Sequence, residues 1–252
     1  MINDALNYPY KQENLTTVLT LAGIAAVLSS IPIIGIIASF LISGYGLRVL
    51  YTILAREDAL PTFDYGTDIT RGFLVALAGI VYMLIPIVLF VVGTILLGRS
   101  AIGLLMLFIL MLPAIVLVSW ALLIATIRFA ITTESQVLWQ IPDNFNTMWE
   151  NRMPLLHLLG RQFIALLPYM IPLLVLNVIF GVMYPEAASL NFQPTLDYFI
   201  VQFIISVLSV GIGFISGITQ YYLVAHFAEE IGFEAEKAKR KPKNDDHYSF
   251  EA

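Results

Sequence analysis

The chain has 252 residues, of which 59% are hydrophobic and only 12% charged, and its mean hydropathy is +0.84. Soluble globular domains carry about 25% charged residues, so this composition excludes an ordinary soluble domain and indicates a membrane protein. The absence of cysteine excludes disulfide frameworks, thiolate catalysis and cysteine metal sites. The net charge of −5 is spread over loops and tail, so we expect no nucleic-acid partner.

Long apolar runs follow one another along the chain, and a membrane-spanning helix needs about 20 such residues. The predicted spans are residues 15–31, 33–50, 72–97, 101–127, 163–184 and 198–224. Pro32 separates the first two, and Asn14 is expected to cap the first helix. The sequence therefore predicts an all-α bundle of six spans in three hairpins over residues 1–228, followed by a disordered cytoplasmic tail at 229–252.

Lysine and arginine are distributed unequally between the two ends of these spans. One side receives Lys11, Arg48, Arg56, Arg71, Arg128, Arg152, Arg161, Lys237, Lys239, Arg240, Lys241 and Lys243. The other side receives Arg99 alone. Because positive charge is retained in the cytoplasm, we expect both termini there and the chain in the inner cell membrane. Arg48 and Arg128, near span ends, are expected to extend to the lipid headgroups.

The sixth predicted span carries small and polar residues on one helical face. This stripe consists of Gln202, Ser206, Ser209, Gly213, Ser216 and Gln220. Gly213 and Gly217 also form a G-x-x-x-G pattern, which lets helices approach closely in a membrane. Together with Asn177 of the fifth span, the stripe is either a packing seam or the polar wall of a substrate cavity. Prolines at 86, 113, 168 and 172 fit both readings, because transporters build sites from broken helices but membrane helices also tolerate proline.

Features of catalysis are missing from the sequence. Every ionisable residue lies in a loop, in the tail or near a span end, which argues against a proton-coupled pump. His157, His226 and His247 are far apart and have no metal-ligand spacing or catalytic motif. We therefore expect no enzyme, no catalytic residue, no metal and no cofactor.

The loop after the second span is rich in carboxylates. They are Glu57, Asp58, Asp64 and Asp68. Such oxygens could bind a hard cation, but their spacing matches no calcium loop. The alternative is a solvated loop with Phe63 docked on the protein.

The segment between the fourth and fifth spans has the spacing of an amphipathic helix. Its apolar face contains Phe145, Met148, Trp149 and Met153. Asp143 or Asn144 would cap this helix. The sequence therefore predicts one interfacial helix at the membrane surface.

Short motifs in the first part of the chain resemble a known family. They are Tyr8-Pro9-Tyr10, the run Gly44-Tyr45-Gly46-Leu47-Arg48-Val49, the run Leu60-Pro61-Thr62-Phe63-Asp64, and Gly72. Together they resemble the prokaryotic membrane family catalogued as domain of unknown function 4013. A tryptophan often follows the loop acid in that family, whereas this chain has Tyr65. The resemblance implies a bacterial or archaeal inner-membrane protein and supplies no activity.

Two classes of function remain open at this point. The first is a non-enzymatic scaffold or accessory subunit, which presents its cytoplasmic loops to protein partners and assembles through the small-residue seams. The alternative is a permease-like transporter or binder of a neutral or amphiphilic solute or lipid. In both cases the lipid bilayer is the first expected partner.

Overall fold

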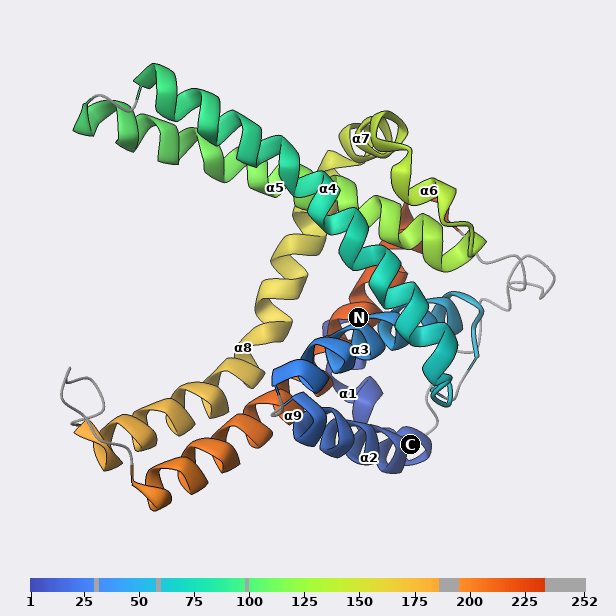
Figure 1. The fold of residues 1–252 in the computed structure, drawn as a ribbon. Coiled ribbons are helices and arrows are strands. Elements are labelled where there is room, and N and C mark those ends of the chain that lie inside the picture. Colours follow the sequence, from blue (N-terminus) through green and yellow to red (C-terminus); the bar gives the residue numbers. More distant parts are fainter. Residues whose placement is uncertain (30–31, 58–59, 98–99, 186–194, 234–252) are drawn as a thin grey trace.

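The computed structural model describes residues 1–29, 32–57, 60–97, 100–185 and 195–233 (Figure 1). All secondary structure in these ranges is helical. The elements are α1 (Ile2–Asn7), the 3-10 helix η1 (Tyr8–Tyr10), α2 (Gln12–Ser29), α3 (Pro32–Leu54), α4 (Tyr65–Leu97), α5 (Ala101–Thr132), α6 (Gln136–Trp139), α7 (Ile141–Glu150), α8 (Arg152–Met183) and α9 (Leu196–Glu230). The end of the first predicted span, Arg99 and the tail from residue 234 lie outside the described residues.

Within the described part of the chain, five helices are long and apolar enough to cross a membrane: α3, α4, α5, α8 and α9. The prediction of an all-α bundle with several candidate membrane spans is therefore confirmed. The sixth predicted span falls on α2, whose apolar stretch, Asn14–Leu28, is shorter, so the sixth span is not shown.

The long helices extend beyond the apolar runs that predict them. Helix α4 begins at Tyr65 instead of 72, α5 ends at Thr132 instead of 127, and α8 begins at Arg152 instead of 163. Hydropathy reports where lipid surrounds a helix, whereas the helix itself continues through polar residues until its backbone groups find a cap. Pro154 does not interrupt α8 because it lies in the first turn, where a missing N–H costs nothing.

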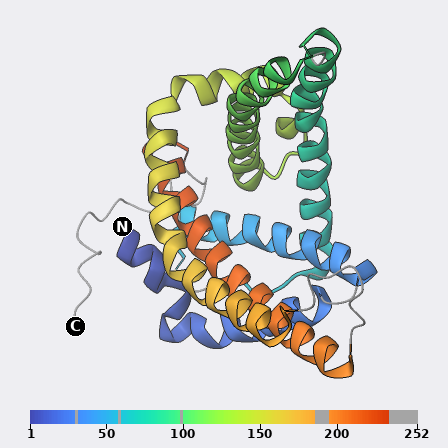
Figure 2. The same ribbon diagram turned by 90° about the vertical axis from the view of Figure 1, so that its left-hand side faces the viewer.

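The helices form a packed base from which two long hairpins project. Helices α4 and α5 run side by side, as do α8 and α9, and both hairpin tips lie on the left of Figure 1, where they diverge. Figure 2 views the molecule from that side. In the base, α3 packs against α4, α5 and α9, while α2 packs against α3 and α9. The buried apolar core lies among these elements.

Large exposed apolar side chains are concentrated on the projecting hairpins. Examples are Leu96 on α4, Ile102 on α5, Val182 on α8 and Leu196 on α9. Contiguous apolar surface of this extent is rare on soluble monomers, whereas lipid chains solvate it well. The hairpins therefore indicate contact with the bilayer.

Helix α8 changes direction near its middle, as Figure 1 shows. Pro168 and Pro172 lie inside this helix, and each removes one backbone hydrogen bond. Between them, the buried Tyr169 hydroxyl lies 2.8 Å from the Thr219 hydroxyl of α9. This bond fixes the bent part of α8 on its neighbour.

A polar cluster where the ends of three helices meet

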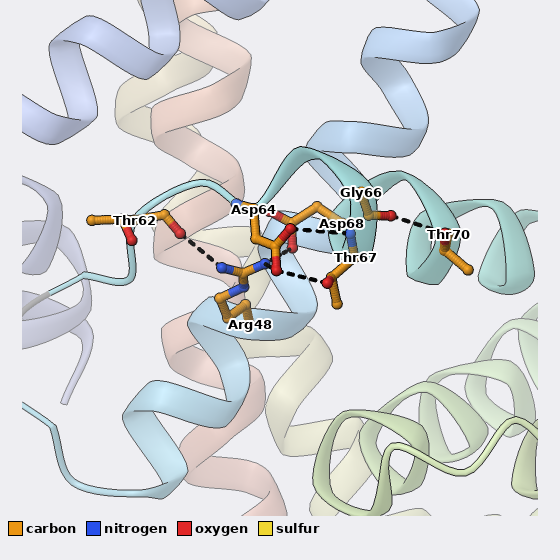
Figure 3. Close-up of polar contacts among 7 residues, drawn as sticks. All are labelled: Arg48, Thr62, Asp64, Gly66, Thr67, Asp68 and Thr70. Atoms are coloured by element: carbon orange, nitrogen blue, oxygen red, sulfur yellow. Dashed lines mark hydrogen bonds and ion pairs between the residues drawn. The ribbon is translucent and has the colours of Figure 1, made fainter.

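Arg48 occupies a part of α3 where a free charge would be costly, because apolar residues of the bundle surround this helix. Its guanidinium points to the start of α4 (Figure 3). Nη2 donates to Oδ1 of Asp68 at 2.6 Å, and Nη1 donates to the backbone oxygen of Thr62 at 2.8 Å. Arg48 therefore joins α3 both to α4 and to the loop that precedes α4.

Asp68 is the most buried charged group of this cluster. Its side chain is 0% exposed, and that of Arg48 is 18% exposed. The second carboxylate oxygen, Oδ2, accepts from the backbone N–H of Asp64 at 3.1 Å. Both oxygens of Asp68 are thus engaged, as a buried carboxylate requires.

Asp64 is the residue at which the loop turns into α4. Its carboxylate accepts from the backbone N–H of Thr67 at 3.3 Å and from the Thr67 hydroxyl at 2.7 Å, which is the pattern of a helix N-cap. These Thr67 hydrogen bonds hold the pKa of Asp64 below its usual value. At 55% exposed, the Asp64 carboxylate is also accessible from solvent, 3.8 Å from Nη2 of Arg48.

Two glycines let α3 and α4 cross at the distance that the ion pair needs. A Cβ at Gly44 would overlap the backbone oxygen of Asp68, and a Cβ at Gly72 would overlap the backbone oxygen of Phe40. Backbones in such close contact leave no room for a side chain. The crossing places Arg48, one turn after Gly44, beside Asp68, one turn before Gly72.

Aromatic packing holds the loop from the other side. The ring of Phe63 lies 4.6 Å from that of Tyr45 on α3 and 5.8 Å from that of Tyr65 on α4, measured between centroids. The ring of Tyr45 is 6.0 Å from that of Phe214 on α9. The loop is therefore packed against α3 and α4, and Tyr45 continues the aromatic packing to α9.

Asn14 anchors the start of the same loop. The sequence predicts it as a helix cap, but α2 already begins at Gln12, and Asn14 is completely buried. Its Oδ1 accepts from the backbone N–H of Leu60 at 3.0 Å, and its Nδ2 donates to the backbone oxygen of Tyr8 at 3.3 Å. Asn14 thus links the N-terminal segment to the loop between α3 and α4.

The structure brings most of the family-like residues to this one place. Gly44, Arg48, Leu60, Phe63 and Asp64 all take part in the contacts just described. Gly46 differs, since a Cβ there would overlap the ring of Tyr221 on α9. Pro61 lies in the loop and is half-buried.

Sequence reasoning did not identify Asp68 as the partner of Arg48. It grouped Asp68 with three other loop acids as a cation candidate, whereas Asp68 lies inside α4. Of those acids, Asp58 lies outside the described residues. Within the described part of the chain, no group of three or more metal-ligating side chains is assembled.

A second polar cluster surrounds Arg128 near the end of α5. Arg128 donates to Oδ1 of Asn144 and to Oε1 of Gln140, both at 2.7 Å. The buried Asn144 donates in turn to the Tyr82 hydroxyl at 2.8 Å and to the backbone oxygen of Val137 at 2.9 Å. Arg48 and Arg128, both expected at the headgroups, each bind the polypeptide segment that follows their helix.

The predicted interfacial helix corresponds to α7. Met148 is buried against the base, Phe145 is half-buried and Trp149 is exposed. Met153 lies beyond the end of α7, in the first turn of α8, and is exposed. Asn144 lies within α7, where it binds other segments instead of capping the helix.

The outer half of the predicted stripe on α9 is exposed or half-buried. Gln202 is exposed, and Ser206 and Ser209 are half-buried. On α8, the amide of Asn177 is exposed and donates to the backbone oxygen of Leu173 within its own helix.

Two residues of the inner half of the stripe, Ser216 and Gln220, pack against other parts of the base. Ser216 is buried, and Nε2 of Gln220 donates to the backbone oxygen of Gln162 on α8 at 3.4 Å. Gly213 lines an apolar hollow of about 260 Å³ between α3 and α9, whose other walls include Ile42, Gly46 and Gly217. A Cβ at Gly213 or Gly217 would meet no atom within 4 Å among the described residues.

A second hollow, of about 470 Å³, adjoins the Arg48 cluster. Its lining residues are Arg48, Tyr51, Asp64, Thr67, Arg71 and Thr133. They come from the end of α3, the start of α4 and the residue after α5. This hollow therefore lies at the ends of three candidate membrane helices.

The comparisons with known proteins identify one family. The family model described as Protein of unknown function (DUF4013) matches residues 27–159, more than half of the chain. The matched region includes the Arg48 cluster and the Arg128 cluster. No curated protein and no solved structure matches the chain.

Proposed function

The chain belongs to the DUF4013 family, which is described as proteins of unknown function, and we propose that it is a non-enzymatic membrane scaffold or accessory subunit. In this role it binds a transmembrane helix of a protein partner on the inner half of α9. The surface that binds the partner helix is the hollow between α3 and α9.

The observation that carries this proposal is the open face at Gly213 and Gly217. Small residues in a G-x-x-x-G pattern usually support a close helix contact, yet at neither glycine would a Cβ have an atom of the described part of the chain within 4 Å. At Gly44 and Gly72, by contrast, the chain's own backbone fills that space. A partner helix would use the space at Gly213 and Gly217 in the same way.

The use of the polar side chains supports a scaffold over a transport pathway. Arg48, Arg128 and Tyr169 bind other elements of the same chain, and the amides of Asn177 and Gln220 bind backbone oxygens. A transport pathway for a polar solute needs polar groups that are free to exchange partners. In the structure these groups hold helices together, except for the Asn177 amide, which bonds within α8.

A filling substitution tests the proposal. A Cβ at position 213 would meet no described atom within 4 Å, and the hollow of about 260 Å³ offers space for a leucine side chain, so we expect Gly213→Leu to keep the melting temperature of the wild type. We expect it to lose the partner-bound species seen for the wild type by native electrophoresis and by copurification from membranes. Gly211→Leu is the matched control, because Gly211 lies on the same helix, also has open space and does not line the hollow.

The absence of cysteine allows a second readout. A single cysteine at Val210, which lines the hollow, should crosslink to the partner in membranes, and Gly213→Leu should abolish the crosslink. Equal behaviour of Gly213→Leu and Gly211→Leu, or a wild type that carries no partner in either assay, argues against the scaffold role.

The alternative function is a binder or permease for an amphiphile, and the apolar lining of the same hollow favours it. In that case Gly213→Leu would displace a copurifying lipid or lower transport, and the protein would migrate as the free chain before and after the substitution. Lipid analysis of the two glycine variants separates the alternatives.

We further propose that α2 crosses the membrane as the sixth span and that both termini are cytoplasmic. Helix α2 has 18 residues and so is about 27 Å long, close to the hydrocarbon thickness of about 30 Å. One face of α2 is buried in the base, and the other exposes Leu15, Leu19 and Val27. Reporter fusions at the two termini should report the same side, whereas five spans would place them on opposite sides.

A further inference from the structure

The hollow beside the Arg48 cluster is lined by three charged side chains that differ in how they are paired within the protein. Arg48 is paired with the buried Asp68, so these two charges cancel. The remaining charged residues of the lining are Asp64 and Arg71. Asp64 is fixed by Thr67 and exposes its carboxylate. Arg71 is half-buried and makes no hydrogen bond or ion pair with the described residues.

Arg71 therefore offers a planar set of N–H donors that has no acceptor among the described residues. Such a group binds phosphate oxygens in a bidentate manner. Tyr51 and Thr133 add hydroxyl groups to the same lining. Asp64 carries the opposite charge to Arg71, and its carboxylate can accept hydrogen bonds from an ammonium group.

The position of the hollow indicates where such a ligand comes from. It lies at the end of α3, the start of α4 and the end of α5, all of which are candidate membrane helices. Helix ends of this kind lie at the level of the lipid headgroups. A volume of about 470 Å³ accommodates a headgroup, since binding pockets for small molecules typically measure about 300–1,000 Å³.

We propose that this hollow binds a phospholipid headgroup that carries both a phosphate and a primary ammonium, with Arg71 donating to the phosphate and Asp64 accepting from the ammonium. Apart from Arg48, whose charge Asp68 neutralises, the lining has one cation and one anion, which favours such a zwitterion over a headgroup with net negative charge. A quaternary ammonium lacks N–H donors, so it binds Asp64 less well. The site is independent of the partner surface on α9.

Native mass spectrometry of the delipidated full chain tests this site by adding back single lipids with identical acyl chains. We expect phosphatidylethanolamine to bind more tightly than phosphatidylcholine, and phosphatidylcholine more tightly than phosphatidylglycerol. Soluble glycerophosphoethanolamine, which carries the same headgroup without chains, distinguishes a lipid site from a site for a free phosphate compound. For a lipid site it should compete only weakly.

The variants separate the two halves of the site. Arg71→Gln should weaken phosphatidylethanolamine binding about tenfold, the effect of losing one hydrogen-bonded charge, and Arg71→Lys should lose less. Asp64→Asn should abolish the preference for ethanolamine over choline. Arg152→Gln and Asp143→Asn are matched controls, since both residues are exposed and neither lines the hollow.

Several results would overturn the inference. They are equal binding of the three lipids, wild-type affinity in Arg71→Gln, or equal loss in Arg71→Gln and Arg152→Gln. Tight competition by glycerophosphoethanolamine would reassign the site to a soluble ligand with the same chemistry. Melting temperatures, measured without lipid, should equal that of the wild type for the arginine variants and for Asp143→Asn. For Asp64→Asn they should fall only slightly, because the amide oxygen still caps α4, so that a loss of binding is not a loss of fold.

Discussion

Arg48 and Asp68 are 20 positions apart in the chain, yet Nη2 of Arg48 lies 2.6 Å from Oδ1 of Asp68. The pair forms where α3 and α4 cross backbone to backbone at Gly44 and Gly72. The ion pair and the helix crossing depend on each other. The close crossing brings Asp68 within reach of Arg48, and the buried Asp68 carboxylate at this crossing needs the Arg48 cation. The family match includes all four residues.

The first prediction concerns the ion pair itself. Asp68→Asn keeps the shape but leaves Arg48 without its nearest counter-charge, so we expect a loss of about 2 kcal/mol in the free energy of unfolding. A lower melting temperature in detergent would report this loss. In Arg48→Gln/Asp68→Asn no uncompensated charge remains, so the double variant should lose less than the sum of the single variants. Strictly additive losses would show that the two side chains do not interact.

The second prediction concerns the helix crossing. Gly72→Ala forces α4 away from the backbone of Phe40, and overpacking of this kind costs about 1–3 kcal/mol. Gly79→Ala is the control in the same helix, because its Cβ would meet only Leu122, at an ordinary 3.6 Å. There, alanine should leave the melting temperature unchanged or raise it slightly, since glycine is the poorer helix former by about 0.5–1 kcal/mol. Equal melting temperatures for the two variants would contradict the close crossing.

The long helices could be predicted from the sequence because lipid selects for uninterrupted apolar runs. The same property explains why their ends could not. Tyr65 to Arg71 are polar enough to look like a loop, but Asp64 caps the helix there and α4 continues through them. The sixth predicted span is not shown, because the apolar stretch of α2, Asn14–Leu28, is shorter than those of the other five helices.

The contacts of the polar cluster could be predicted only in part. The motif residues Arg48 and Asp64 were identified from the family resemblance, but four acids in the loop region offered equivalent partners for Arg48. The crossing at Gly44 and Gly72 selects Asp68, and a crossing is a tertiary feature that no local pattern encodes. For the same reason Asn14 and Asn144 were predicted as caps, whereas tertiary packing buries both.

The third prediction tests the Arg128 cluster. Asn144→Ala removes the partner of Arg128, the Tyr82 hydroxyl and the Val137 carbonyl together, so we expect a loss of about 2–3 kcal/mol in the free energy of unfolding. Tyr82→Phe removes one hydrogen bond and should cost about 1 kcal/mol. The cycle of single and double variants should reveal coupling between the two residues. Asn146→Ala, at an exposed position of the same helix, should leave stability unchanged, and a drop equal to that of Asn144→Ala would show that α7 is generally sensitive.

The last prediction tests the anchor of the loop between α3 and α4. Asn14→Ala removes the acceptor of the Leu60 N–H and the donor to the Tyr8 carbonyl, so the loop should open locally more often. Hydrogen exchange of Leu60 should accelerate about fivefold, which corresponds to one hydrogen bond of about 1 kcal/mol. Thr16→Ala, on the exposed face of α2, is the control and should change neither exchange nor stability.

Because Phe63 packs on Tyr45 and Arg48 holds Thr62 and Asp68, exchange in the first turn of α4 should rise less than exchange of Leu60. Uniform acceleration over loop and helix would mean that Asn14 supports the whole base and not the loop alone.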